Sequence, residues 1–120
     1  MKEIKSKNVV YILKCDKYYK IGSAGVLLRD RINGFRLNNP FPMNVVLLIE
    51  GYTELETYLH KKYDNKWLRN EWFMLSEEDI EYLTNRYHMS RMLKDRLNII
   101  NEKINAPGHI GHKKWKQLQW

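Results

Sequence analysis

The sequence is poor in cysteine and has no long apolar run. Cys15 is the only cysteine in 120 residues, so a disulfide within the chain and a zinc site built from several cysteines are both excluded. The apolar run at residues 9–13 is too short for a signal peptide or a membrane span. We therefore expect a soluble, intracellular protein in the reducing cytoplasm, with no membrane partner.

Acidic residues are fewer than basic ones. The chain has 14 Asp and Glu against 21 Lys and Arg, which gives a net charge of +7. This balance favours a polyanionic partner, with DNA the first candidate, although ribosomal and membrane-surface proteins share it. The length and an apolar content of 43% suit one domain with one core.

The first half of the chain has the pattern of a β-hairpin followed by a helix. Residues 9–13 and 18–22 are rich in β-branched and aromatic residues and are separated by a short polar connection. Residues 26–37 place apolar side chains at helical spacing, with three basic residues among them. We therefore predict a basic helix that carries Arg29, Arg31 and Arg36.

Two prolines, Pro40 and Pro42, end this helix in a loop. The continuous apolar run at residues 45–49 predicts a third strand, buried on both faces at the centre of a sheet.

The second half has the start signals of two helices, followed by a further amphipathic segment. Thr53 with Glu56 and Ser76 with Asp79 each form a capping-box pattern. A further amphipathic segment at 92–104 either continues the helix before it or is separated from it by a break at 87–90. The tail from His109 to Trp120 has neither helical nor strand periodicity and is either a packed arm or a flexible basic extension.

Several short motifs occur in a characteristic order. They are Val10-Tyr11-Ile12, Tyr19-Lys20-Ile21-Gly22, Asn39-Pro40-Phe41, a Glu-x-x-Leu-His motif at 56–60, and Glu71-Trp72-Phe73. Over residues 8–85 the chain resembles the GIY-YIG nuclease superfamily, in its phage-associated branch with a Lys-Ile-Gly second motif.

The resemblance implies both a fold and an activity. The fold would be α+β, with a small three-stranded, mainly antiparallel sheet flanked by helices. Residues 1–85 would form the catalytic domain, and residues 86–120 a C-terminal helix and basic tail packed on it. The activity would be metal-dependent hydrolysis of DNA phosphodiester bonds.

Hydrolysis of a phosphodiester needs an activated water and positive charge near the phosphate. Tyr11 is the candidate base, because Lys20 on the partner strand would lower the pKa of its phenol, and the resemblance implies the same role. Arg31, nine residues before Pro40, is the candidate phosphate clamp. The alternatives are a core aromatic for Tyr11 and a solvated arginine for Arg31.

A single Mg²⁺ or Mn²⁺ would be held by Glu56, with water and phosphate completing its ligands. The alternative is that Glu56 only caps its helix. His60 lies one turn later on the same helix face, as a further catalytic candidate or a packed histidine. The residues expected to contact DNA are Arg29, Arg36, Lys61 and Lys62.

Glu71 or Asn70 falls where the superfamily often has a late polar active-site residue, but the adjacent Trp72 and Phe73 have the character of core anchors. Two other functions stay open. Lys20 replaces the tyrosine of the second motif, which permits a nucleic-acid-binding module without catalysis. A protein-interaction module is the other, and a homodimer is possible.

Overall fold

The computed structural model describes residues 8–25, 34, 41–51 and 53–105. Its strands are β1 (Asn8–Cys15), β2 (Tyr18–Ala24), β3 (Met43–Gly51), β4 (Trp67–Arg69) and β5 (Trp72–Phe73). Its helices are α2 (Thr53–Lys62), α3 (Glu77–Arg86) and α4 (Arg91–Ile104), with a 3-10 turn, η1 (Asp64–Lys66), after α2. The predicted basic helix and the C-terminal tail lie outside the described residues.

The described strands form one antiparallel sheet in the order β3-β1-β2-β5-β4. This confirms the α+β class and the three expected strands, and it adds two short ones. Strands β4 and β5 have three and two residues, which is too short for an alternating pattern to identify them in the sequence.

The β1–β2 hairpin turns at Asp16 and Lys17, because Cys15 pairs with Tyr18. Asp16 has a positive φ of 59°, a conformation that aspartate tolerates better than most residues. Both strands are therefore longer than the apolar runs that predicted them, and β2 extends to Ala24.

Strand β3 is the outermost described strand on its side of the sheet, so the predicted central position was wrong. Its apolar run is continuous because helices cover both faces. Val45 and Leu48 belong to one buried cluster, and Leu47 and Ile49 belong to the other. A continuous apolar run indicates that both faces of a strand are covered, and it does not indicate which strands pair with it.

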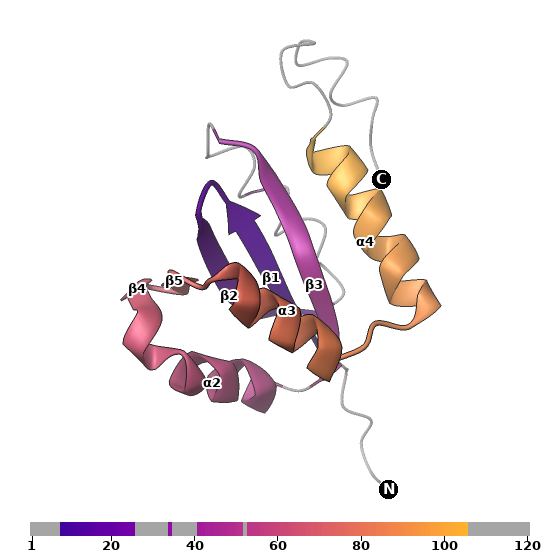
Figure 1. Cartoon of the computed structure of the whole chain (residues 1–120). Coiled ribbons are helices and arrows are strands. Elements are labelled where there is room, and N and C mark those ends of the chain that lie inside the picture. The colour runs from indigo at the N-terminus through magenta and orange to yellow at the C-terminus, as the bar shows by residue number, and fades with distance from the viewer. Residues whose placement is uncertain (1–7, 26–33, 35–40, 52, 106–120) are drawn as a thin grey trace, which may run out of the picture.

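The two buried clusters lie on opposite faces of the sheet. Figure 1 shows α3 crossing the strands, with α4 running along β3. Helix α4 contributes Leu93, Ile100 and Ile104 to one cluster. Helices α2 and α3 contribute Leu59 and Leu83 to the other. The sheet is therefore the central layer of the fold, with α4 on one face and α2 and α3 on the other.

Helix α3 begins as its sequence predicts. The Ser76 hydroxyl accepts from the Asp79 backbone N–H, and the Asp79 carboxylate accepts from the Ser76 N–H, which completes the capping box. Of the two alternatives left open for residues 87–90, the structure shows the break, because Ser90 caps a separate α4. No helix in the described part of the chain is long and apolar enough to cross a membrane.

A side-chain amide covers the outer edge of β3. Asn101 Oδ1 accepts from the Val45 N–H at 2.7 Å, and Asn101 Nδ2 donates to the Val45 carbonyl at 2.9 Å. The amide satisfies two backbone groups that an adjacent strand would otherwise pair. Helix α4 is therefore fixed to the sheet by polar contacts as well as by its apolar face.

Replacing Asn101 with alanine is expected to lower the free energy of unfolding by about 1–3 kcal/mol, because two partly buried backbone groups lose their partner. Urea denaturation followed by circular dichroism measures the change. Asn105→Ala is the matched control, since among the described residues that exposed amide donates to the Asn44 side chain and the Asn101 carbonyl and to no strand backbone. Equal losses in the two variants would contradict the edge-covering role.

Candidate functional site

The edge of β2 is only partly paired. Strand β5 pairs with β2 at Tyr19 and Lys20, and the Glu71 carbonyl then accepts from the Ile21 N–H at 3.0 Å. Beyond that point β1 still pairs with one edge of β2, but in the described part of the chain no strand pairs with the other edge. The last residues of β2 are therefore open to side chains from neighbouring elements.

Tyr11 lies against glycine at this end of β2. Its cross-strand partner is Gly22, and its side chain is fully buried. A Cβ at Gly22 would lie 2.6 Å from the Tyr11 hydroxyl oxygen and 2.9 Å from Glu71 Oε1. The phenol oxygen and the carboxylate therefore approach the same point, and only glycine leaves room for both.

Lys20 lies on the same face of β2 as Gly22. Its own partner on β1 is Leu13, so it is a diagonal neighbour of Tyr11 rather than the residue opposite. Lys20 Nζ is 3.3 Å from Glu71 Oε1 and 5.3 Å from the centre of the Trp72 ring. Glu71, a weak candidate in the sequence, is thus close to both Tyr11 and Lys20.

Glu56 and His60 approach β2 from helix α2. Glu56 Oε1 accepts from the Ser23 hydroxyl at 2.6 Å, and Oε2 is 3.5 Å from His60 Nε2. His60 Nε2 also lies 2.9 Å from the Ile21 carbonyl oxygen. Because a carbonyl only accepts, this contact assigns a proton to Nε2. The imidazole and the Phe73 ring pack edge to face, with 4.9 Å between the ring centres.

The two groups of side chains lie on opposite faces of β2. Residues along a strand alternate between faces, so Lys20 and Gly22 face Tyr11, whereas Ile21 and Ser23 face α2. Both groups contact the last residues of β2, one on each face. Four of the predicted site residues are thus brought to one short stretch of strand: Tyr11, Lys20, Glu56 and His60.

The other predicted residues are elsewhere. Lys61 and Lys62 are exposed at the end of α2, away from the contacts made by Glu56 and His60. The three arginines of the predicted basic helix, Arg29, Arg31 and Arg36, lie outside the described residues. The Glu56 carboxylate contacts Ser23 and His60, and its alternative role as a helix cap falls on residues outside those that the structure describes.

The donor set restricts the kind of metal that could bind. Among the described residues no three His, Cys, Asp or Glu side chains form a cluster able to hold an ion. A cation held by protein groups alone, such as structural zinc, does not fit this part of the chain. Glu56 is 16% exposed and fits a cation that takes one carboxylate and keeps most of its water, as Mg²⁺ does.

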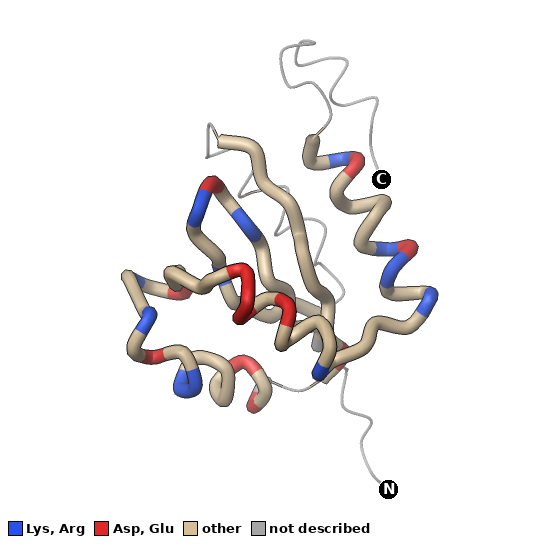
Figure 2. Tube along the Cα trace, in the orientation of Figure 1, with Lys and Arg blue, Asp and Glu red and all other residues tan. Residues whose placement is uncertain are grey.

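Charge is distributed unevenly between the described core and the rest of the chain. The described residues hold equal numbers of basic and acidic side chains, twelve of each, so the net charge of +7 comes from the other segments. Within the core, acidic residues begin α3 and lysines end α2 (Figure 2). Long-range attraction of a polyanion therefore depends on residues outside the described core.

Replacing Gly22 with alanine is expected to destabilise the protein by about 1–3 kcal/mol, because the new methyl group would overlap the buried Tyr11 ring. Gly51→Ala is the control, since a Cβ there meets the end of the Leu55 side chain at 3.2 Å. Urea denaturation compares the two. A Gly22 variant as stable as the Gly51 variant would show that the Tyr11 ring is not fixed over Gly22.

Comparison with known proteins places the chain in a family. Curated proteins gave no match, and solved structures gave none either. The model of the T5orf172 domain matches residues 8–88, from β1 to the segment that follows α3. All the residues gathered at the end of β2 fall inside this match, and α4 falls outside it. The chain belongs to the T5orf172 domain family, a phage-associated group of nuclease-related domains.

Proposed function

We propose that the chain is an endonuclease of the GIY-YIG type, which hydrolyses phosphodiester bonds in DNA with the help of one Mg²⁺ or Mn²⁺. Membership of a nuclease-related family supports the class of reaction. The observation that carries the proposal is the gathering of Tyr11, Lys20, Glu56 and His60 around the open end of β2. A phenol, a carboxylate, an imidazole and an ammonium are groups suited to acid–base and phosphate chemistry.

Tyr11 would activate the attacking water. Its oxygen would take a proton from the water as the water oxygen forms a bond to phosphorus. The bond from phosphorus to the departing sugar oxygen would break, and that oxygen would take a proton from solvent water. The neighbouring Glu71 carboxylate can take the proton of the phenol, so that the transfer balances. Lys20, paired with Glu71 at 3.3 Å, would hold that carboxylate in position.

Glu56 would hold the cation, with Ser23 and His60 orienting its carboxylate. When bound, the ion would supply positive charge to the phosphate oxygens and the leaving group. His60 also ties α2 to the backbone of β2 through the Ile21 carbonyl. This contact fixes the helix relative to the strand and would keep Glu56 at a constant distance from the phosphate.

Arg31 remains the proposed phosphate clamp, since a guanidinium can bind two phosphate oxygens at once. Arg29, Arg36, Lys61 and Lys62 are proposed to contact the DNA backbone. The charge surplus of the segments outside the described core supports this division. The core would supply the chemistry, and the other segments would supply most of the electrostatic attraction.

A second candidate is a nucleic-acid-binding module without catalysis. It is favoured by Lys20, which stands where the second motif of the superfamily has tyrosine and which is paired with Glu71. This ion pair neutralises two of the groups beside Tyr11. Such a module would bind DNA with or without metal and would not cut it.

Cleavage of supercoiled plasmid in Mg²⁺ or Mn²⁺ separates these functions. The wild-type chain is expected to nick the plasmid, and Glu56→Gln is expected to lower the rate by roughly 100-fold or more, because the carboxylate charge that holds the ion is lost. Glu54→Gln is the matched control, with the same change at an exposed position of the same helix. It should cleave at the wild-type rate.

One result would contradict the endonuclease proposal, and another would contradict only the role given to Glu56. Binding without cleavage by the wild-type chain would favour the second candidate. Cleavage that survives Glu56→Gln would show that a different carboxylate serves the reaction.

A further inference from the structure

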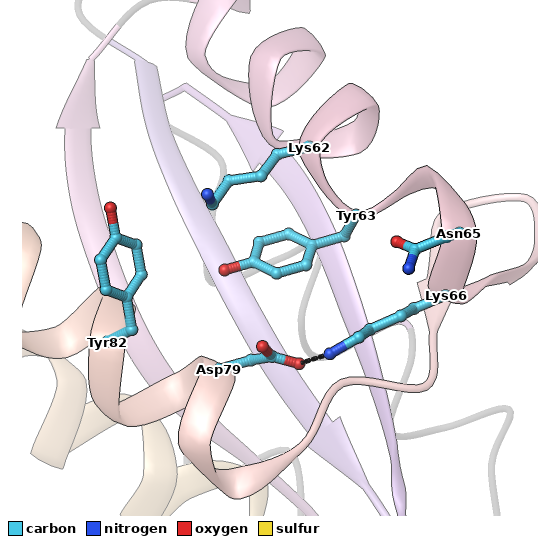
Figure 3. A pocket seen from close by; sticks show the side chains of 6 residues that line it. All are labelled: Lys62, Tyr63, Asn65, Lys66, Asp79 and Tyr82. Carbon is cyan, nitrogen blue, oxygen red and sulfur yellow. Dashed lines mark hydrogen bonds and ion pairs between the residues drawn. The ribbon is translucent and has the colours of Figure 1, made fainter.

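An open pocket lies between the end of α2, η1 and α3. It has a volume of about 400 Å³, and its lining residues are Lys62, Tyr63, Asn65, Lys66, Asp79 and Tyr82. Figure 3 shows their side chains converging on one hollow. Lys62 and Tyr63 follow His60 by two and three residues on the chain, so the pocket begins close in sequence to the proposed site, and it includes one of the proposed DNA-contacting residues, Lys62. The volume is in the range of small-molecule and nucleotide sites.

One end of the pocket is polar and electrically balanced. Asp79 Oδ2 accepts from Lys66 Nζ and from the Ser76 N–H. Burial alone would raise the pKa of Asp79, but the hydrogen bonds from Lys66 and Ser76 and the Lys66 charge outweigh burial and lower it. Asp79 is therefore ionised at neutral pH and its charge is neutralised by Lys66. Asn65 adds an amide that can both donate and accept.

The other end is aromatic and carries a cation. Lys62 Nζ lies 5.6 Å from the centre of the Tyr63 ring and 5.1 Å from that of Tyr82. In the described part of the chain Lys62 forms no ion pair with a carboxylate. Tyr63 is buried, while Tyr82 is 51% exposed. The exposed Tyr82 ring therefore offers a flat apolar surface next to the Lys62 ammonium, which has no carboxylate partner among the described residues.

Tyr63 contributes a neutral hydroxyl to the pocket. Burial, together with the charge of Asp79, raises the pKa of this phenol to about 12. It therefore keeps its proton at neutral pH and adds no negative charge that would repel an anionic ligand.

We propose that this pocket binds one unpaired nucleotide of the DNA strand beside the cleavage site. The base stacks on the exposed Tyr82 ring, its phosphate contacts Lys62, and its polar edge faces Asn65 and Asp79. This inference rests on the proposed endonuclease function and adds a substrate class to it, namely DNA with a single-stranded segment. A base paired inside a duplex could not reach the Tyr82 ring.

The charges around the pocket favour a base over a simple anion. Asp79 is inside the pocket, and the exposed Glu77 and Glu78 lie on the first turn of the same helix. Phosphate is therefore accepted only at the Lys62 end. Because the described core has no net charge, most of the binding at this pocket comes from stacking, which is less sensitive to salt than phosphate contacts are.

Fluorescence anisotropy tests the proposal with the full chain in EDTA, which prevents cleavage. The probes are a short labelled oligothymidine and a labelled hairpin duplex with the same number of phosphates. Tyr82→Ala is expected to weaken binding of the single strand by roughly 5- to 100-fold while leaving duplex binding nearly unchanged. Tyr82→Phe, which keeps the ring, should bind both probes as the wild type does.

Tyr58→Ala is the matched control. Tyr58 is 53% exposed on α2 and does not line the pocket, so this variant should bind both probes normally. Lys62→Ala is expected to reduce the salt dependence of single-strand binding, whereas Tyr82→Ala should leave the salt dependence unchanged. Urea denaturation checks that each variant is folded.

Two outcomes overturn the inference, and they differ in what they say about function. If Tyr82→Ala changes the two affinities equally, or changes neither while the duplex still binds, the pocket is not a nucleotide site and the endonuclease proposal stands. If the wild-type chain binds neither probe, DNA is not its partner, and the pocket inference and the proposed function fail together.

Discussion

Strand β5 pairs with β2 at only two residues, Tyr19 and Lys20, and the rest of the candidate site follows from this short pairing. Beyond it, the edge of β2 receives the Glu71 backbone and the His60 ring instead of another strand. A longer β5 would occupy the space through which α2 reaches the sheet. Gly22 adds the second requirement, because it leaves room for the Tyr11 phenol and the Glu71 carboxylate on the other face.

The sequence predicts those parts of the fold that depend on local patterns. The hairpin and the Ser76 capping box follow from spacing and from short-range hydrogen bonds, whereas the break before Ser90 was one of two alternatives that the pattern left open. The edge position of β3 could not be predicted, because an apolar run shows that both faces are covered and not which strands are adjacent. Strands β4 and β5 are too short to leave a pattern.

The candidate site could be predicted only in part, because its geometry depends on contacts between residues that are distant in the sequence. Motif order suggested Tyr11 and Glu56, but their placement on opposite faces of β2 depends on strand register and on the packing of α2. The closeness of Glu71 to Lys20 depends on the turn between β4 and β5, where Asn70 has a positive φ of 53°. The Lys62–Tyr82 pocket joins two helices separated in sequence and has no motif of its own.

The central claim is that the groups on the two faces of β2 serve one reaction centre. Plasmid cleavage rates of Tyr11→Phe, Glu56→Gln and the double variant test it directly. If Tyr11 and Glu56 act in one centre, the double variant should be about as slow as the slower single variant, because either loss alone disables the unit. Losses that multiply, or a Tyr11 variant that cleaves at the wild-type rate, would contradict the account.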